Sequence, residues 1–149
     1  MKKLFVLLGF ITSANVFAQT NIVDCKENAL TTGSAAFIYT NTADKNAYRN
    51  ELTSLYSKNN LQNSAQELDR YMQLYDYFDS TKNLKKTKDV NFNLRQAGYM
   101  GKESWNICFS KNKVAPTASN KCFHSGLEQE KDPTLSKLVN LSKTCSAMK

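Results

Sequence analysis

Residues 64–81 read SAQELDRYMQLYDYFDST, and this stretch decides the fold class of the chain. Its apolar side chains recur at helical spacing and form a single stripe of Leu68, Tyr71, Met72, Tyr75 and Phe78. At about 100° per residue the stripe covers an arc of about 120°, which is wide enough to face a hydrophobic core. Ser64 and Glu67 match a capping box, in which each side chain accepts from the backbone N–H of the other residue. The stretch predicts an amphipathic helix that begins at Ser64 and reaches Thr81.

Residues 41–58 predict a second helix upstream. Asp44 can cap it, and its apolar face then consists of Tyr48, Leu52, Leu55 and Tyr56. Asn59 and Asn60 end the segment. Because the connection to Ser64 is short, we expect these two helices to run antiparallel.

Asp132 and Pro133 predict the start of a third helix. Asp is a good capping residue, and Pro fits the first turn, where no amide donor is needed. The apolar side of this helix holds Leu135, Leu138, Val139 and Cys145. We therefore expect Cys145 to point toward the core.

Residues 89–131 give a less decided pattern. Apolar residues alternate at 90–94 and at 105–109, as they do in strands, yet helical spacing also fits Val90, Leu94, Ala97 and Gly101. We favour helix, with Gly98 and Gly101 marking a break. The short apolar run 35–39 fits a strand or a helix. The fold expected from these segments is mostly α: a small disulfide-stapled bundle of four to five helices, with a short strand pair as the open alternative.

The first eighteen residues have the order of a secretory signal peptide. Lys2 and Lys3 precede an apolar run at 4–11, and Val16-Phe17-Ala18 places small residues before the junction. The apolar run is shorter than the roughly 20 residues that span a bilayer. We expect cleavage before Gln19, a single helical domain over residues 19–149, no transmembrane segment in the mature chain and a periplasmic or secreted product.

All four cysteines follow the predicted junction, and an even number in an exported chain indicates two disulfides. The cysteines are Cys25, Cys108, Cys122 and Cys145, which allow three pairings. The segment between Cys108 and Cys122 is rich in turn residues, so we expect this pair to bond locally and Cys25 to bond Cys145 by elimination. A zinc site would favour a close Cys-x-x-Cys pair, which the sequence lacks. We expect neither a metal nor a cofactor.

Positive charge is concentrated in the second half of the chain, whose overall formal net charge is +7. Residues 19–80 hold five basic and eight acidic side chains, whereas residues 81–149 hold thirteen basic and five acidic ones. The densest basic group is Lys82, Lys85, Lys86, Lys88 and Arg95. This group predicts a docking patch for an anionic partner, or alternatively a set of cations that complement the carbonyl end of the preceding helix. We do not expect nucleic acid as a partner, because no aromatic residues interleave the run.

The sequence predicts different positions for two aromatic residues, Tyr77 and Trp105. Tyr77 lies about 180° from Leu68 on the same predicted helix, opposite the core stripe. An exposed tyrosine suits a protein interface, and packing against the segment between Cys108 and Cys122 is the alternative. Trp105, the single tryptophan, should fill the core.

Catalytic signals are sparse. His124 is the single histidine, and we expect it to lie exposed beside a disulfide rather than to act as a general base. The carboxylate pairs Asp76/Asp79 and Glu128/Glu130 could serve glycoside hydrolysis, but nothing in their spacing indicates a cleft. Asp79 falls inside an apolar arc, which predicts that the helix frays there or that a lysine pairs with it.

These observations favour a non-enzymatic binding protein of the bacterial envelope, with Tyr77 and the basic group as its binding residues. The specific expectation is an immunity protein or inhibitor that binds a toxin or a cell-wall hydrolase. Two alternatives remain: a small periplasmic or secreted hydrolase that uses carboxylates or His124, and an accessory component of a secretion or conjugation apparatus.

Overall fold

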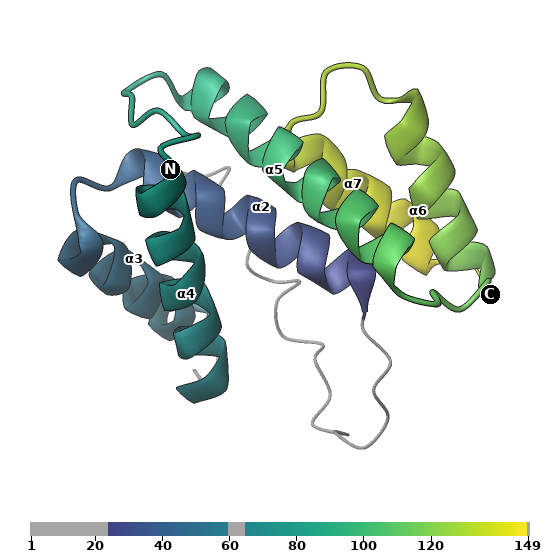
Figure 1. Ribbon diagram of the computed structural model, residues 1–149, viewed down its shortest axis with the longest axis horizontal. Coiled ribbons are helices and arrows are strands. Elements are labelled where there is room, and N and C mark those ends of the chain that lie inside the picture. The colour runs from purple at the N-terminus through teal and green to yellow at the C-terminus, as the bar shows by residue number, and fades with distance from the viewer. Residues whose placement is uncertain (1–23, 60–64, 149) are drawn as a thin grey trace.

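The computed structural model describes residues 24–59 and 65–148, and within these ranges it contains six helices and no strand (Figure 1). They are α2 (Cys25–Asn41), α3 (Lys45–Lys58), α4 (Ala65–Thr81), α5 (Val90–Lys111), α6 (Ala118–Gln129) and α7 (Leu135–Ser146). The predicted mostly α bundle is confirmed, with more helices than the expected four to five and no strand pair in the described ranges. None of these helices combines the length and apolar character that a membrane crossing requires. The predicted signal peptide, its junction at Gln19 and the capping residue Ser64 lie outside the described residues.

The central element is α2, which runs between the other helices (Figure 1). Every residue from 33 to 40 is buried, and a helix buried on all sides belongs in an interior. The run 35–39, for which strand and helix were both open, lies within α2 and is helical. Asn41 ends α2, so the expectation that the next helix begins there is wrong. The predicted cap is confirmed, because the Asp44 side chain accepts from the N–H of Ala47 at 2.9 Å and starts α3.

Small residues let α5 pack antiparallel against α2 at very close range. A Cβ added to Gly101 would lie 2.8 Å from the carbonyl oxygen of Ala29. A Cβ added to Gly33 would lie 3.0 Å from the carbonyl oxygen of Ala97. The backbones of the two helices are thus nearly in contact, and larger side chains at these positions would force them apart.

The predicted break at Gly98 and Gly101 is wrong, because α5 continues through both residues. Their role is to make room for neighbours. A Cβ on Gly98 would overlap the carbonyl oxygen of Pro133, and one on Gly101 would overlap the Leu138 side chain. Glycine within this helix therefore marks tight packing of α7 and its entry segment.

The predicted start of the last helix is also wrong by a few residues. Thr134 caps α7, and its hydroxyl accepts the backbone N–H three residues later at 3.3 Å. The backbone N–H of Asp132 instead donates to the Glu130 carboxylate at 3.0 Å, in the turn that precedes the helix. Pro133 is buried against Gly98, so this proline serves packing rather than the first helical turn.

Both predicted disulfide pairings are wrong. The structure joins Cys25 to Cys108 and Cys122 to Cys145, with Cα–Cα distances of 5.5 and 5.6 Å. The reason is helix packing: Cys25 and Cys108 lie at the facing ends of the antiparallel pair α2 and α5, while α6 packs on α7. Each disulfide therefore locks one helix pair. The described residues include no free cysteine, and Cys145 is fully buried as expected.

The remaining helices, α3 and α4, run antiparallel as predicted. Lys45 near the start of α3 pairs with Asp76 near the end of α4, while Tyr56 near the end of α3 contacts Glu67 in the first turn of α4. Between these contacts the Tyr48 hydroxyl donates to the Tyr71 carbonyl oxygen at 3.0 Å. The stripe of residues 68–78 faces this aromatic layer, so the amphipathic helix derived from the sequence is confirmed.

Candidate functional site

The described residues form a groove between α2, α4 and α5. α4 approaches α2 near the ends of both helices and diverges from it toward its own first turn (Figure 1). The space that remains has a volume of about 380 Å³, within the range of ligand pockets. Its floor is formed by Asn28 and Thr32 of α2, and one wall by Leu74 and Tyr77 of α4. The other wall consists of α5 residues and the residue after them: Met100, Glu103, Ser104, Ile107, Cys108, Lys111 and Asn112.

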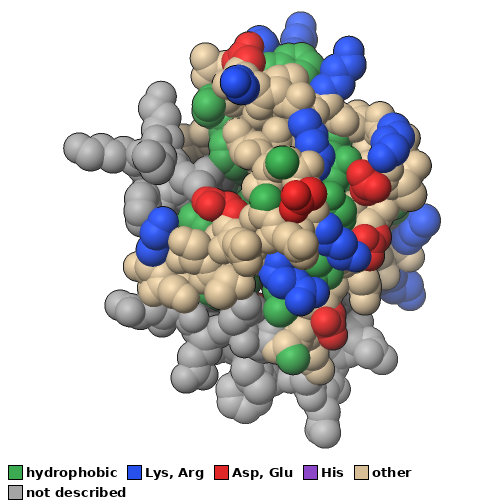
Figure 2. Space-filling view, turned by 90° about the vertical axis from the view of Figure 1, so that its left-hand side faces the viewer, with side chains coloured by type: hydrophobic (Ala, Val, Ile, Leu, Met, Phe, Trp, Pro, Cys, Tyr) green, Lys and Arg blue, Asp and Glu red, His purple; other side chains and the backbone are tan. Residues whose placement is uncertain are grey.

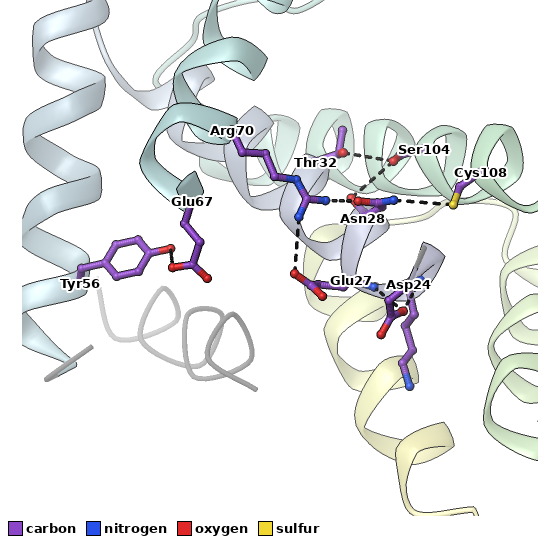
Figure 3. Close-up of polar contacts among 10 residues, drawn as sticks. Asp24, Glu27, Asn28, Thr32, Tyr56, Glu67, Arg70, Ser104 and Cys108 are labelled. Carbon is purple, nitrogen blue, oxygen red and sulfur yellow. Dashed lines mark hydrogen bonds and ion pairs between the residues drawn. The ribbon is translucent and has the colours of Figure 1, made fainter. Parts of the chain in front are cut away.

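A chain of hydrogen bonds fixes the polar floor of the groove (Figure 3). The Thr32 hydroxyl donates to Ser104 Oγ at 3.1 Å, and Ser104 donates in turn to the carbonyl oxygen of Asn28 at 3.4 Å. The Asn28 amide Nδ2 points at Cys108 Sγ, 3.7 Å away. These contacts tie α2 to α5, so the floor presents polar atoms at fixed positions.

Arg70 connects α4 to α2 beside the groove, where it contacts the lining residue Asn28 (Figure 3). Its guanidinium donates to Asn28 Oδ1 and lies 3.5 Å from a carboxylate oxygen of Glu27. Burial raises the pKa of Glu27, and Arg70 opposes that rise. Beyond Arg70, the Tyr56 hydroxyl donates to Glu67 at 3.5 Å, and burial raises the pKa of Tyr56. The polar contacts thus extend from α3 through α4 to α2 and set the position of the α4 wall.

Exposed apolar side chains stand on both walls. Tyr77 on α4 is 49% exposed and Ile107 on α5 is 47% exposed. Tyr77 is thus exposed as predicted, and it lines the groove together with Cys108 and Asn112, where the segment between the two cysteines begins. The binding role of Tyr77 stays a prediction.

The groove also carries two opposite charges along α5. Glu103 and Lys111 both line it, and each is exposed. Neither side chain has an ion pair or hydrogen bond with another described residue. Ile107 lies midway between them in sequence, which gives the α5 wall the order acid, apolar, base.

Two members of the predicted basic group are engaged by the protein itself. Lys82 Nζ lies 3.1 Å from Asp79, and its hydrogen bond lowers the pKa of that carboxyl, so a lysine pairs with Asp79 as one of the two expectations had it. Lys86 Nζ lies over the rings of Tyr39 and Tyr75, at 4.4 and 5.4 Å from their centroids. It also donates to the carbonyl oxygen of residue 43 at 2.8 Å. Partial burial lowers the pKa of Lys86.

The other members, Lys85, Lys88 and Arg95, are exposed, and their side chains have no ion pair among the described residues. None of the five basic residues lines the groove. On the face of the molecule seen in Figure 2, basic and acidic side chains are interspersed rather than gathered into an area of one sign. The structure does not join Tyr77 and the basic group into one site.

His124 differs from the expectation of an exposed histidine, because its side chain is 31% exposed and makes three contacts. The buried Trp105 donates its indole N–H to His124 Nδ1 at 3.1 Å. The imidazole stacks on Phe109 with ring centroids 4.2 Å apart, and Nε2 lies 3.5 Å from Glu128. A buried indole N–H needs an acceptor, and His124 supplies it. The expected core position of Trp105 is confirmed.

The carboxylates considered for catalysis are engaged separately. Asp76 pairs with Lys45 at 2.6 Å, and Glu130 pairs with Lys137 at 2.9 Å. No group of three or more potential metal ligands occurs among the described residues. Of the groove residues, Glu103 is the acidic one.

No protein-family model, curated protein or solved structure matches this chain. The site therefore rests on its own geometry. Sequence reasoning identified Tyr77 but missed the floor and the α5 wall. The wall was detectable in principle, because helix was favoured for this segment and Glu103, Ile107 and Lys111 recur every four residues, but the predicted break at Gly98 and Gly101 and the alternation at 105–109 left its helical face undefined.

Proposed function

We propose that this chain is an exported, non-enzymatic binding protein of a bacterial envelope, which binds a protein partner through the groove between α2, α4 and α5. The observation that carries the proposal is the pair Tyr77 and Ile107, about half exposed on facing walls of one groove. Tyrosine supplies a large, rigid contact surface with a polar end, and such residues are enriched in protein interfaces.

The fixed floor supports the same proposal. The hydrogen bonds that join Thr32, Ser104 and Asn28 hold these polar groups in place before any partner arrives. A preorganised surface loses less conformational entropy on association, so more of the contact energy remains as affinity. A few fixed polar groups among apolar walls are also typical of binding sites.

The two disulfides support an oxidising compartment, where such bonds persist, in agreement with the predicted signal peptide. Within this class we propose an immunity protein or inhibitor that covers part of a toxin or of a cell-wall hydrolase. A small cross-linked domain suits this role because it survives outside the cytoplasm and acts by occupying a surface.

A truncation of Tyr77 tests the proposal against a matched tyrosine. Protein purified from the periplasm captures its partner from envelope extracts, and the dissociation rate of the purified complex is then measured. Tyr77→Ala should raise that rate about 30-fold, equivalent to about 2 kcal/mol for a central aromatic anchor. Tyr99→Ala is the control, because Tyr99 is 51% exposed on α5 but does not line the groove.

Equal dissociation rates for both variants would contradict the proposed site. The inhibitor role has its own readout, since the captured toxin or hydrolase should lose activity when the purified protein is added back. A hydrolytic activity of the chain itself that disappears with Glu103→Gln would replace the binding proposal with an enzymatic one.

A further inference from the structure

We infer that the groove receives an amphipathic helix of the partner, whose apolar anchor is flanked one turn away on each side by residues of opposite charge. This inference rests on the proposed binding function and specifies the chemistry of the partner. Its basis is the line of Glu103, Ile107 and Lys111 along the α5 wall.

The charges at the ends of this line are available to a partner. Glu103 and Lys111 are exposed, line the groove and have no ionic partner among the described residues. At 1.5 Å per residue, their positions lie about 12 Å apart along the helix axis. Arg70 does not compete with Lys111 for a partner carboxylate, because it already binds Glu27 and Asn28.

The middle of the groove suits an apolar anchor. Ile107 and Met100 on α5 face Leu74 and Tyr77 on α4 across a space of about 380 Å³. A space of this size holds one or two large apolar side chains rather than a whole helix. The partner helix therefore lies along the mouth of the groove and inserts its anchor between Tyr77 and Ile107.

Helical spacing matches the groove better than an extended segment does. On an α-helix, residues four apart lie on the same face and rise by about 6 Å, so a sequence of charge, apolar anchor and opposite charge at i, i+4 and i+8 repeats the spacing of the α5 wall. An extended strand would need a sheet edge with unpaired backbone groups, whereas every element that lines the groove is a helix. The recognition mode is a helix in a groove.

Three conformationally constrained helical peptides test this inference with the purified full-length exported protein. Each carries leucine at i+4, with glutamate and lysine, two glutamates, or two lysines at i and i+8. Backbone NMR shifts of the protein are followed up to about 1 mM peptide. The peptide with opposite charges should bind about fivefold tighter than either peptide of one sign, because exposed ion pairs contribute modestly. The shifts should centre on Tyr77 and Ile107.

Charge variants of the protein make the test specific. E103K gives the wall two positive ends and should switch the preference to the peptide with two glutamates. K111E gives it two negative ends and should switch the preference to the peptide with two lysines. Both positions are exposed, so the variants should keep the wild-type NMR spectrum away from the groove. A peptide with alanine in place of leucine should bind to none of them.

Absence of peptide binding at about 1 mM would overturn the inference. The same order of peptide affinities in the wild type, E103K and K111E would overturn it too. So would self-association of the free protein through Tyr77, detected by sedimentation, because a second copy would then be the occupant. The proposed function fails separately: if Tyr77→Ala still weakens the native complex while no helical peptide binds, the binding proposal stands and the helical partner does not.

Discussion

Two parts of this molecule are held together by different means. The braced part, formed by α2, α5, α6 and α7, has both disulfides and the near contact of the α2 and α5 backbones. The aromatic part, α3 and α4, has no disulfide to the rest in the described structure and is joined to α2 by rings, hydrogen bonds and ion pairs. The groove lies where the two parts meet. It therefore has one covalently fixed wall and one wall held by reversible contacts.

The energies of these contacts explain why the difference matters. A disulfide contributes about 2–4 kcal/mol, whereas an aromatic pair contributes about 0.5–1.5 kcal/mol beyond its buried area. The ring of Tyr39 packs against those of Tyr75 and Phe78 with centroids 5.2 and 5.6 Å apart. Several modest contacts thus position α4. We expect motion of the groove to occur in α4, because its non-covalent contacts can break one at a time. The end of α5 is instead held to α2 by a disulfide.

The largest expected effect comes from removing a disulfide of the braced part. Replacing Cys25 and Cys108 with alanine should lower the free energy of unfolding by about 4.5 kcal/mol in the chain-entropy model, because the bond closes a loop with a sequence separation of 83. The Cys122→Ala/Cys145→Ala protein, with a separation of 23, should lose about 3.5 kcal/mol. Urea unfolding measures both. A larger loss of unfolding free energy from the Cys122/Cys145 replacement would show that loop length does not determine how much each disulfide stabilises the protein.

A substitution in the near contact should have an intermediate effect. Gly101→Ala places a Cβ 2.8 Å from the backbone carbonyl of Ala29 and against Leu138, so it should destabilise the protein by about 2 kcal/mol through overpacking. Gly126→Ala is the matched control. The three atoms nearest to its added Cβ all belong to the Leu141 side chain, which can rotate away. Thermal unfolding of both variants gives the comparison. Equal losses would mean that the α2–α5 backbone contact is not limiting.

The smallest effect should come from the aromatic part. Lys86→Met removes the cation from the faces of Tyr39 and Tyr75 and should destabilise the protein by about 1 kcal/mol. Hydrogen exchange should quicken in α3 and α4 while protection in α2 and α5 stays unchanged. Lys85→Met, which removes a charge from an exposed neighbour, should change neither. Faster exchange throughout the chain would show that the two parts open as one unit.

Local patterns in the sequence predicted local structure well. The stripe of residues 68–78 and the cap at Asp44 describe contacts between neighbouring residues, so periodicity and capping rules found both. The wrong predictions concern features that depend on contacts between segments far apart in the sequence. Gly98 resembles a helix breaker until Pro133 is seen against it, because the glycine serves a contact 35 positions along the chain.

The disulfide pairing and most of the groove could not be predicted from the sequence for the same reason. A turn-rich segment between Cys108 and Cys122 favours local closure, but the packing of α5 on α2 and of α6 on α7 places each sulfur beside another helix. Tyr77 could be recognised as a residue opposite its own core stripe. The floor at Asn28 could not, because its importance depends on which helices converge there.

The bond between Cys25 and Cys108 also makes the groove dependent on the oxidation state of two cysteines. Cys108 lines the groove, Asn28 contacts its sulfur, and Lys111 follows one turn later on the same helix. While these cysteines are still thiols, nothing covalent holds the first turn of α2 to the end of α5. Reduction would therefore leave the floor and the basic end of the wall joined by non-covalent contacts alone, which makes the shape of the groove sensitive to the redox state of its surroundings.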